Sequence, residues 1–179
     1  MIYFVGDRYL FSLVKEGFLL PRLRRFYSKD HFHHVTSRGN WRGDLFRDRR
    51  DYEYFLKRLE LLHEEFGIEI ASYCLMPNHY HLQIRTKEMH LSKIMARLNK
   101  KYADRYNRKY NVSGHLFEKR FFSKPIFDPI GIAEVSSYIH LNPVKARLVD
   151  YPEEYEWSSY KFFFKPKSSR PSFLQIDPL

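Results

Sequence analysis

Apolar side chains recur every three or four residues in two long segments, and this spacing predicts two amphipathic helices. The first covers residues 50–66, with Gly67 in a position to end it, and the second covers roughly residues 91–110. A third helix is expected over residues 128–142. Its Asp-Pro start suits an N-cap followed by the first helical position, and Pro143 should end it near Asn142.

Shorter apolar segments between these helices predict strands. Residues 33–37 form one, 68–77 a second, and the stretch MPNHYHLQI at 76–84 continues into a third. The Pro-Asn step between the last two is short enough for only a tight reversal, so these strands should pair antiparallel. Residues 114–127 should also be extended. The order β-α-β-β-α-β-α predicts an α+β fold, an antiparallel sheet with helices packed on it.

Composition and charge narrow the class of protein. The chain has 179 residues, 44% of them hydrophobic and 18% aromatic, which favours one folded domain. Its 31 Lys and Arg against 21 Asp and Glu make a polyanion the expected partner. Charged residues interrupt the apolar N-terminus, so neither a membrane span nor a signal peptide is predicted. The single Cys74 suits a reducing compartment, and we expect a cytoplasmic protein.

Two histidines alternate within the third strand. Side chains at positions i and i+2 of a strand point to the same side, so His79 and His81 should lie next to each other, with Gln83 beyond them. Two imidazoles on a rigid strand could hold a metal ion, or could face solvent or pair with carboxylates. The segment HFHH offers His31 and His33 at the same spacing, and spacing alone does not separate the two pairs.

The segment SSYIHLNP places a tyrosine near an amide. On a helix Tyr138 and Asn142 are four residues apart and share a face, an arrangement that suits a nucleophile beside a metal ligand. A phenol has a pKa near 10, so it needs a cation or a base to react at neutral pH. The alternative is that Tyr138 only packs at the end of an amphipathic helix.

The helix at 91–110 is strongly basic and carries tyrosines at four-residue spacing. Such cations suit a phosphate backbone, and tyrosine rings can stack on bases. A solvated basic face with one tyrosine edge in the core is the alternative, and these tyrosines also compete with Tyr138 as the nucleophile. The candidate DNA contacts on this helix are Lys93, Arg97, Lys100, Lys101, Tyr102, Arg105 and Tyr106.

Several blocks in a fixed order resemble one known family. HHVTSRGN, LMPNHYHL, GHLFEKRF, YIHLNPVKARLV and WSSY together are similar to the tyrosine HUH transposases, in particular their REP-associated branch. The resemblance covers most of the chain and implies a ferredoxin-like, RRM-like HUH nuclease fold. It also implies a metal-dependent endonuclease and strand transferase acting on single-stranded DNA with hairpin or repeat elements, without a small-molecule substrate.

The resemblance also implies residue roles. His79 and His81 would be metal ligands, Asn142 a third ligand, and Tyr138 the nucleophile that forms a 5′-phosphotyrosine, with Mg²⁺ or Mn²⁺ as the ion. The HFHH segment then belongs to the first strand and not to the metal site. Arg38 and Arg42 join the candidate DNA contacts on the residues themselves, without family support.

The resemblance sets expected domain limits and leaves alternatives. Residues 23–160 would form the transposase domain, 1–22 an extension of unknown role and 161–179 an irregular tail. A domesticated, non-catalytic DNA-binding protein of the same fold is one alternative, and an RNA-binding or structural metal module is another. Both monomers and homodimers are compatible with the sequence.

Overall fold

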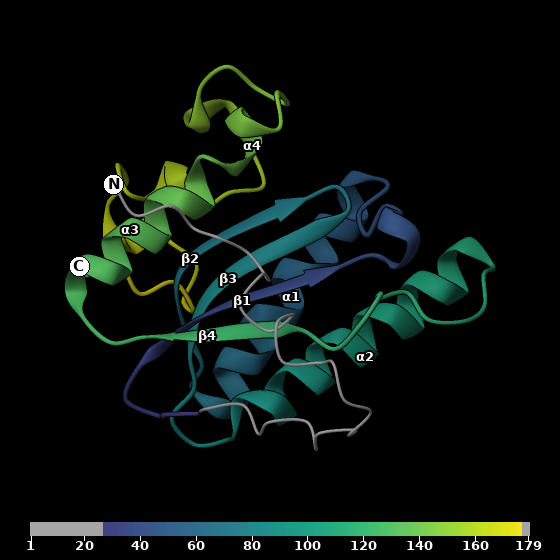
Figure 1. Ribbon diagram of the computed structural model, residues 1–179, viewed down its shortest axis with the longest axis horizontal. Coiled ribbons are helices and arrows are strands. Elements are labelled where there is room, and N and C mark those ends of the chain that lie inside the picture. The colour runs from purple at the N-terminus through teal and green to yellow at the C-terminus, as the bar shows by residue number, and fades with distance from the viewer. Residues whose placement is uncertain (1–26, 177–179) are drawn as a thin grey trace, which may run out of the picture.

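The computed structural model describes residues 27–176, so the extension expected at residues 1–22 lies outside the described part of the chain. The predicted element order is confirmed, and the fold is an α+β sandwich (Figure 1). All strand pairs are antiparallel, in the order β2-β3-β1-β4. The elements are β1 (Phe32–Arg38), α1 (Arg49–Phe66), β2 (Glu69–Met76), β3 (His79–Arg85), α2 (Leu91–Tyr110), β4 (Phe122–Ile126), α3 (Pro129–His140) and α4 (Asn142–Lys145).

Helices cover both faces of the sheet. Helices α1 and α2 pack on the face that carries Val35, Tyr80 and Leu82, and they form the larger hydrophobic core with it. Helix α3 packs on the opposite face, in a smaller core that includes Cys74 and Ile139. Because strand side chains alternate, the even-numbered and odd-numbered positions of β3 serve different layers. The odd-numbered positions, which include both histidines of the pair, belong to the α3 side.

The helix ends follow the caps read from the sequence. Gly67 ends α1 in the left-handed region, at φ 58°, and Asp128 accepts a 2.7 Å hydrogen bond from the backbone N–H of Gly131 at the start of α3. The expected end of α3 near Asn142 was two residues too long. The helix stops at His140, and Pro143 stands inside the short helix α4, near its start, where a missing N–H costs nothing.

The strands were predicted more closely at the centre of the sheet than at its edge. Met76 pairs with His79 across the Pro77-Asn78 reversal, as expected. The extended segment expected over residues 114–127 was too long, because only Phe122–Ile126 forms a strand against β1. Strand β4 lies at the edge of the sheet, a position that tolerates Pro125.

The outer edge of β2 is covered by the C-terminal part of the chain. The backbone N–H of Ile70 donates to Phe173 O at 2.8 Å, and the N–H of Gln175 donates back to Ile70 O at 2.8 Å. Phe173 and Leu174 are buried in the larger core, so this irregular segment covers the β2 edge of the sheet. Within residues 27–176, no helix combines the length and the apolar character needed to cross a membrane.

Candidate functional site

Strand register places the histidine pair at the centre of the α3 side of the sheet. His81 lies opposite Thr36 of β1 and Cys74 of β2, and His79 lies opposite Arg38 and Met76. The site is therefore built on the two inner strands, whose backbones are fixed by neighbours on both sides. A rigid base of this kind holds ligating side chains in place.

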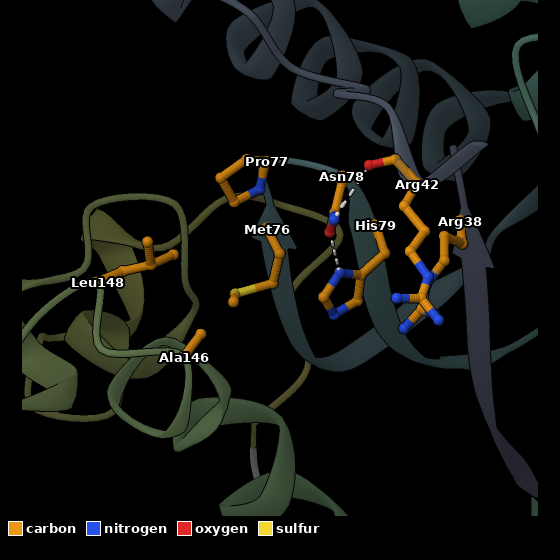
Figure 2. Close-up of a pocket in the computed structure, with 8 residues that line it drawn as sticks. All are labelled: Arg38, Arg42, Met76, Pro77, Asn78, His79, Ala146 and Leu148. Atoms are coloured by element: carbon orange, nitrogen blue, oxygen red, sulfur yellow. Dashed lines mark hydrogen bonds between the residues drawn. The ribbon is translucent and has the colours of Figure 1, made fainter. Parts of the chain in front are cut away.

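The orientation of His79 is fixed by the reversal that precedes it. Asn78 Nδ2 donates to the carbonyl oxygen of Arg42 at 3.3 Å, so Asn78 Oδ1 faces His79 Nδ1, 2.7 Å away (Figure 2). An amide oxygen only accepts, and Nδ1 must therefore carry the proton. In the neutral ring this leaves the lone pair on Nε2, the atom a metal ion would take.

His81 is held by residues of β1. Its Nδ1 lies 3.0 Å from Nε2 of His34 and 3.1 Å from Oγ1 of Thr36. The Nδ1 atom is thus engaged within the protein, and Nε2 is the remaining ring nitrogen. His31 and His33 were the candidates in HFHH, whereas the fourth residue of this segment, His34, is the one that reaches the site. Alternation places His34 on the same side of β1 as Thr36 and Arg38, but only the register between β1 and β3 brings that side to His81.

Burial keeps these imidazoles neutral. It lowers the pKa of His79 to about 4, helped by the positive charge of Arg38. It lowers the pKa of His34 to about 4 as well, with a contribution from Lys124. For His81, burial and the neighbouring His34, His79 and Arg38 lower the pKa well below its ordinary value. Neutral imidazole is the form that binds metal ions.

Helix α3 brings the tyrosine to the same place. The Tyr138 ring stands edge-on to His81, with ring centroids 5.6 Å apart, and edge-on to His34 at 5.8 Å. Lys145 Nζ of α4 lies 5.0 Å from the Tyr138 ring centroid. Asn142 Nδ2 donates to the carbonyl oxygen of Tyr138 at 2.7 Å, which ties the start of α4 to the last turn of α3. Residues from β1, β3, α3 and α4 thus meet around one phenol.

A pocket of about 480 Å³ opens beside His79 (Figure 2). Arg38 and Arg42 both line it. The opposite side is apolar, with Ala146 and Leu148 from the segment after α4. The pocket therefore combines two cations, one imidazole and an apolar wall, and the cations favour an anionic ligand.

The donor set fits the implied ion only in part. His79 and His81 present neutral imidazoles on one face, which suits Mn²⁺ more than Mg²⁺ among the two ions expected. Among residues 27–176 there is no group of three or more His, Cys, Asp and Glu side chains arranged to hold a metal ion. A complete site would need further oxygen donors, from an amide such as Asn142, from water or from a phosphate.

The tyrosines of α2 that were expected as candidate DNA contacts are buried. Tyr102 and Tyr106 are 1% and 4% exposed, and their hydroxyls donate to the backbone carbonyls of Leu45 and Asp44. Rings enclosed in this way offer no face to a base. Burial also raises the pKa of Tyr102 far above its ordinary value, so it is a poor rival to Tyr138 as nucleophile.

The basic face of α2 lies on the other side of the sheet from the histidines. Arg97 pairs with Glu65 at 2.8 Å, Lys100 with Asp104 at 2.9 Å, and Arg105 with Asp51 at 3.5 Å. These cations are partly neutralised and do not line the site. By contrast, Arg38 and Arg42 line the pocket beside His79. Of the candidate DNA-binding cations, they are the two that lie beside the histidine pair.

The fold and the site define a class: a four-stranded antiparallel sheet that carries two central histidines beneath a helical tyrosine. The family model described as "Transposase IS200 like" matches residues 27–142, and the chain belongs to this family. The family resemblance read from the sequence is thereby confirmed.

Two individual proteins are similar to the chain. A putative REP-associated tyrosine transposase of Haemophilus influenzae is 28% identical over 109 residues, which cover 54% of this chain and 61% of that relative. The chain thus matches less than two thirds of its length. A solved REP-associated tyrosine transposase, bound to a REP hairpin, superposes with a TM-score of 0.63 at 19% identity, over 80% of this chain and 84% of that one. This likeness supports the fold.

Proposed function

We propose that the protein is a metal-dependent endonuclease and strand transferase for single-stranded DNA, with Tyr138 as its nucleophile. The observation that carries the proposal is the position of Tyr138, edge-on to His81 at 5.6 Å and beneath the ammonium group of Lys145. A core tyrosine needs neither a buried histidine cluster nor a cation at its ring. A nucleophile for a phosphodiester needs both an ion site and positive charge nearby.

The proposed reaction is a transesterification. Tyr138 Oη forms a bond to phosphorus, and the bond from phosphorus to the 3′ oxygen breaks. The phenol proton passes to solvent, and the departing oxygen takes up a proton to become a free 3′-OH. The product is a 5′-phosphotyrosine. Since one phosphoester replaces another, the same 3′-OH or a second one can reverse the step and join strands without ATP.

We propose that His79 and His81 hold Mg²⁺ or Mn²⁺ through their Nε2 atoms, with the Asn142 amide oxygen as a third ligand. Bound there, the ion would polarise the scissile phosphate. The chain's own residues do the rest. Asn78 orients His79, His34 and Thr36 orient His81, and the bond from Asn142 to the Tyr138 carbonyl fixes the end of α3. The exposed cations Arg38, Arg42 and Lys145 would bind neighbouring phosphates.

Hairpin DNA is the proposed partner. The names of two similar proteins support it: one is called a REP-associated tyrosine transposase, and the other was solved with a REP hairpin. Because Tyr138 contacts His81 of its own chain, one chain suffices to build the site, and this supports the monomer over a helix-exchanged homodimer. We expect the protein to work in the cytoplasm, where chromosomal repeats are accessible.

A denaturing gel tests the proposal. Labelled hairpin oligonucleotides with single-stranded flanks are incubated with Mn²⁺ and either the wild type or Tyr138→Phe. We expect a covalent species that migrates more slowly than the free oligonucleotide, with the wild type alone. EDTA should prevent its formation. Tight binding without any covalent species, across hairpins from the flanks of the gene, would instead establish the non-catalytic DNA-binding alternative. An adduct that survives Tyr138→Phe would move the nucleophile to another tyrosine.

A further inference from the structure

Trp41 is presented to solvent in a conformation that costs free energy. Its side chain is 92% exposed, the largest fraction among the large hydrophobic residues of the described chain. Its backbone lies in the left-handed region at φ 54°, and Arg42 follows at φ 58°. Bulky side chains avoid this region, and two in succession are unusual. Strained backbone of this kind tends to occur where it positions a functional side chain.

The loop that carries Trp41 is tightly closed. The N–H of Arg42 donates to Gly39 O at 3.1 Å, and the N–H of Gly43 donates to Asn40 O at 2.8 Å. A Cβ atom at Gly39 would lie 2.1 Å from the Gly43 carbonyl oxygen, so only glycine permits this closure. Trp41 therefore stands on a fixed turn.

The same loop is fastened to the reversal that orients His79. The N–H of Gly39 donates to Asn78 O at 2.9 Å, and Asn78 Nδ2 donates to Arg42 O at 3.3 Å. Arg42, the immediate neighbour of Trp41, lines the pocket beside His79 together with Arg38. An exposed indole and two guanidinium groups are thus held in fixed relation to the histidine pair.

We propose that Trp41 stacks on an unpaired nucleobase of the strand whose phosphate lies at His79 and His81. The inference rests on the proposed function and adds a residue that positions the strand. An indole offers a flat face to any base, and the adjacent arginines bind the phosphates that flank it. The two neighbouring cations favour an anionic aromatic ligand over an apolar protein surface, which would have to desolvate them.

Tryptophan fluorescence gives a direct test, because the chain has only two tryptophans. Trp157 is stacked on Tyr52 with ring centroids 4.4 Å apart, so it has little access to a ligand. Wild type and Trp41→Phe are titrated with a hairpin oligonucleotide that has a single-stranded flank, and with the same hairpin whose flank consists of abasic sites. We expect quenching in the wild type with the base-containing flank only, and almost none in Trp41→Phe.

Affinity provides the second readout. Trp41→Ala should weaken binding of the base-containing hairpin by about 5- to 150-fold, the range for loss of one stacked base, and Trp41→Phe should recover part of it. Binding of the abasic hairpin should be unchanged. Phe164→Ala is the matched control, since Phe164 is 75% exposed and lies outside the loop. Because Trp41 is exposed, neither Trp41→Ala nor Trp41→Phe should change thermal stability.

The outcomes separate this inference from the proposed function. Quenching at Trp41 without a covalent adduct at Tyr138 on any hairpin would support base stacking by Trp41 and contradict the proposed cleavage by Tyr138. A Tyr138 adduct with no quenching, and with unchanged affinity in Trp41→Ala, would overturn the stacking and retain the catalysis. Equal quenching by the abasic and base-containing flanks would also overturn it, because the indole would then sense the backbone alone.

Discussion

The imidazoles of His34 and His81 lie nearly parallel, with 23° between their planes and His34 Nε2 3.0 Å from His81 Nδ1. They come from β1 and β3, and the antiparallel register brings them together diagonally, since Thr36 is the residue directly opposite His81. A hydrogen bond of this kind fixes the ring and tautomer of a ligating histidine.

This relationship makes His34 a positioning residue. His34→Leu should weaken Mn²⁺ binding by about 10- to 100-fold, because His81 loses the partner that holds its ring. Titration calorimetry on the folded variant measures the effect. His31→Leu is the control, since His31 belongs to the same HFHH segment but bonds to Ser28. Equal Mn²⁺ affinities for the two variants would show that His34 does not support the site.

Tyr102 and Tyr138 should respond oppositely to loss of the hydroxyl group. Tyr102→Phe removes a buried hydrogen bond to Leu45 O and should reduce the free energy of unfolding by about 1–2 kcal/mol, with adduct formation retained. Tyr138→Phe should abolish the adduct. Urea unfolding and the gel assay on both variants measure the two effects, and adduct loss in Tyr102→Phe at full folding would contradict the assignment.

Asp51 should be important for stability and not for chemistry. Its carboxylate is 1% exposed and lies 2.6 Å from both Lys109 Nζ and Tyr110 Oη, which fastens the end of α2 to the start of α1. Asp51→Asn should reduce the free energy of unfolding by about 2 kcal/mol, because Lys109 and Tyr110 lose a buried, charged acceptor and Lys109 keeps only the more exposed Asp48.

The control for Asp51 is the exposed pair on α2. Lys100 and Asp104 are 2.9 Å apart but have side chains 75% and 47% exposed. Asp104→Asn should therefore change the free energy of unfolding by less than about 0.5 kcal/mol. Similar losses in the two variants would mean that burial does not distinguish these ion pairs.

Gly39 should be required for the loop beside the site. Gly39→Ala places a methyl group against the Gly43 carbonyl and should open the turn, lowering both hairpin affinity and thermal stability. Gly43→Ala meets its nearest atom, Asn40 O, only at 3.1 Å and should have a much smaller effect. Binding assays and thermal melts compare them. Hairpin affinity that is equal in both variants would count against the loop as a DNA contact.

Local sequence signals predicted the helices and the central reversal well. The bounds of α2 agree with the expected 91–110, because a regular apolar stripe defines the helix along its whole length. The caps at Gly67 and Asp128 were also read correctly. The break between α3 and α4 was missed because a proline predicts a helix end only to within a turn.

Contacts between residues far apart in the sequence could not be predicted from these local signals. Whether His31, His33 or His34 joins His81 depends on the register between β1 and β3, and no local pattern encodes it. The sequence of α2 gave no indication that this helix packs on the opposite side of the sheet from the histidines. Tyr102 was a candidate DNA contact, with a tyrosine edge in the core as the alternative, and its burial favours that alternative.

The measurement that tests the central claim most directly is peptide mapping of the covalent protein–DNA product. Trypsin does not cut before proline, so residues 121–145 form one peptide in which Tyr138 is the only tyrosine, while Tyr102, Tyr106 and Tyr110 fall on other peptides. After nuclease trimming, mass spectrometry should find the nucleotide adduct on peptide 121–145 alone, at Tyr138. An adduct on any other tyrosine peptide would contradict the account.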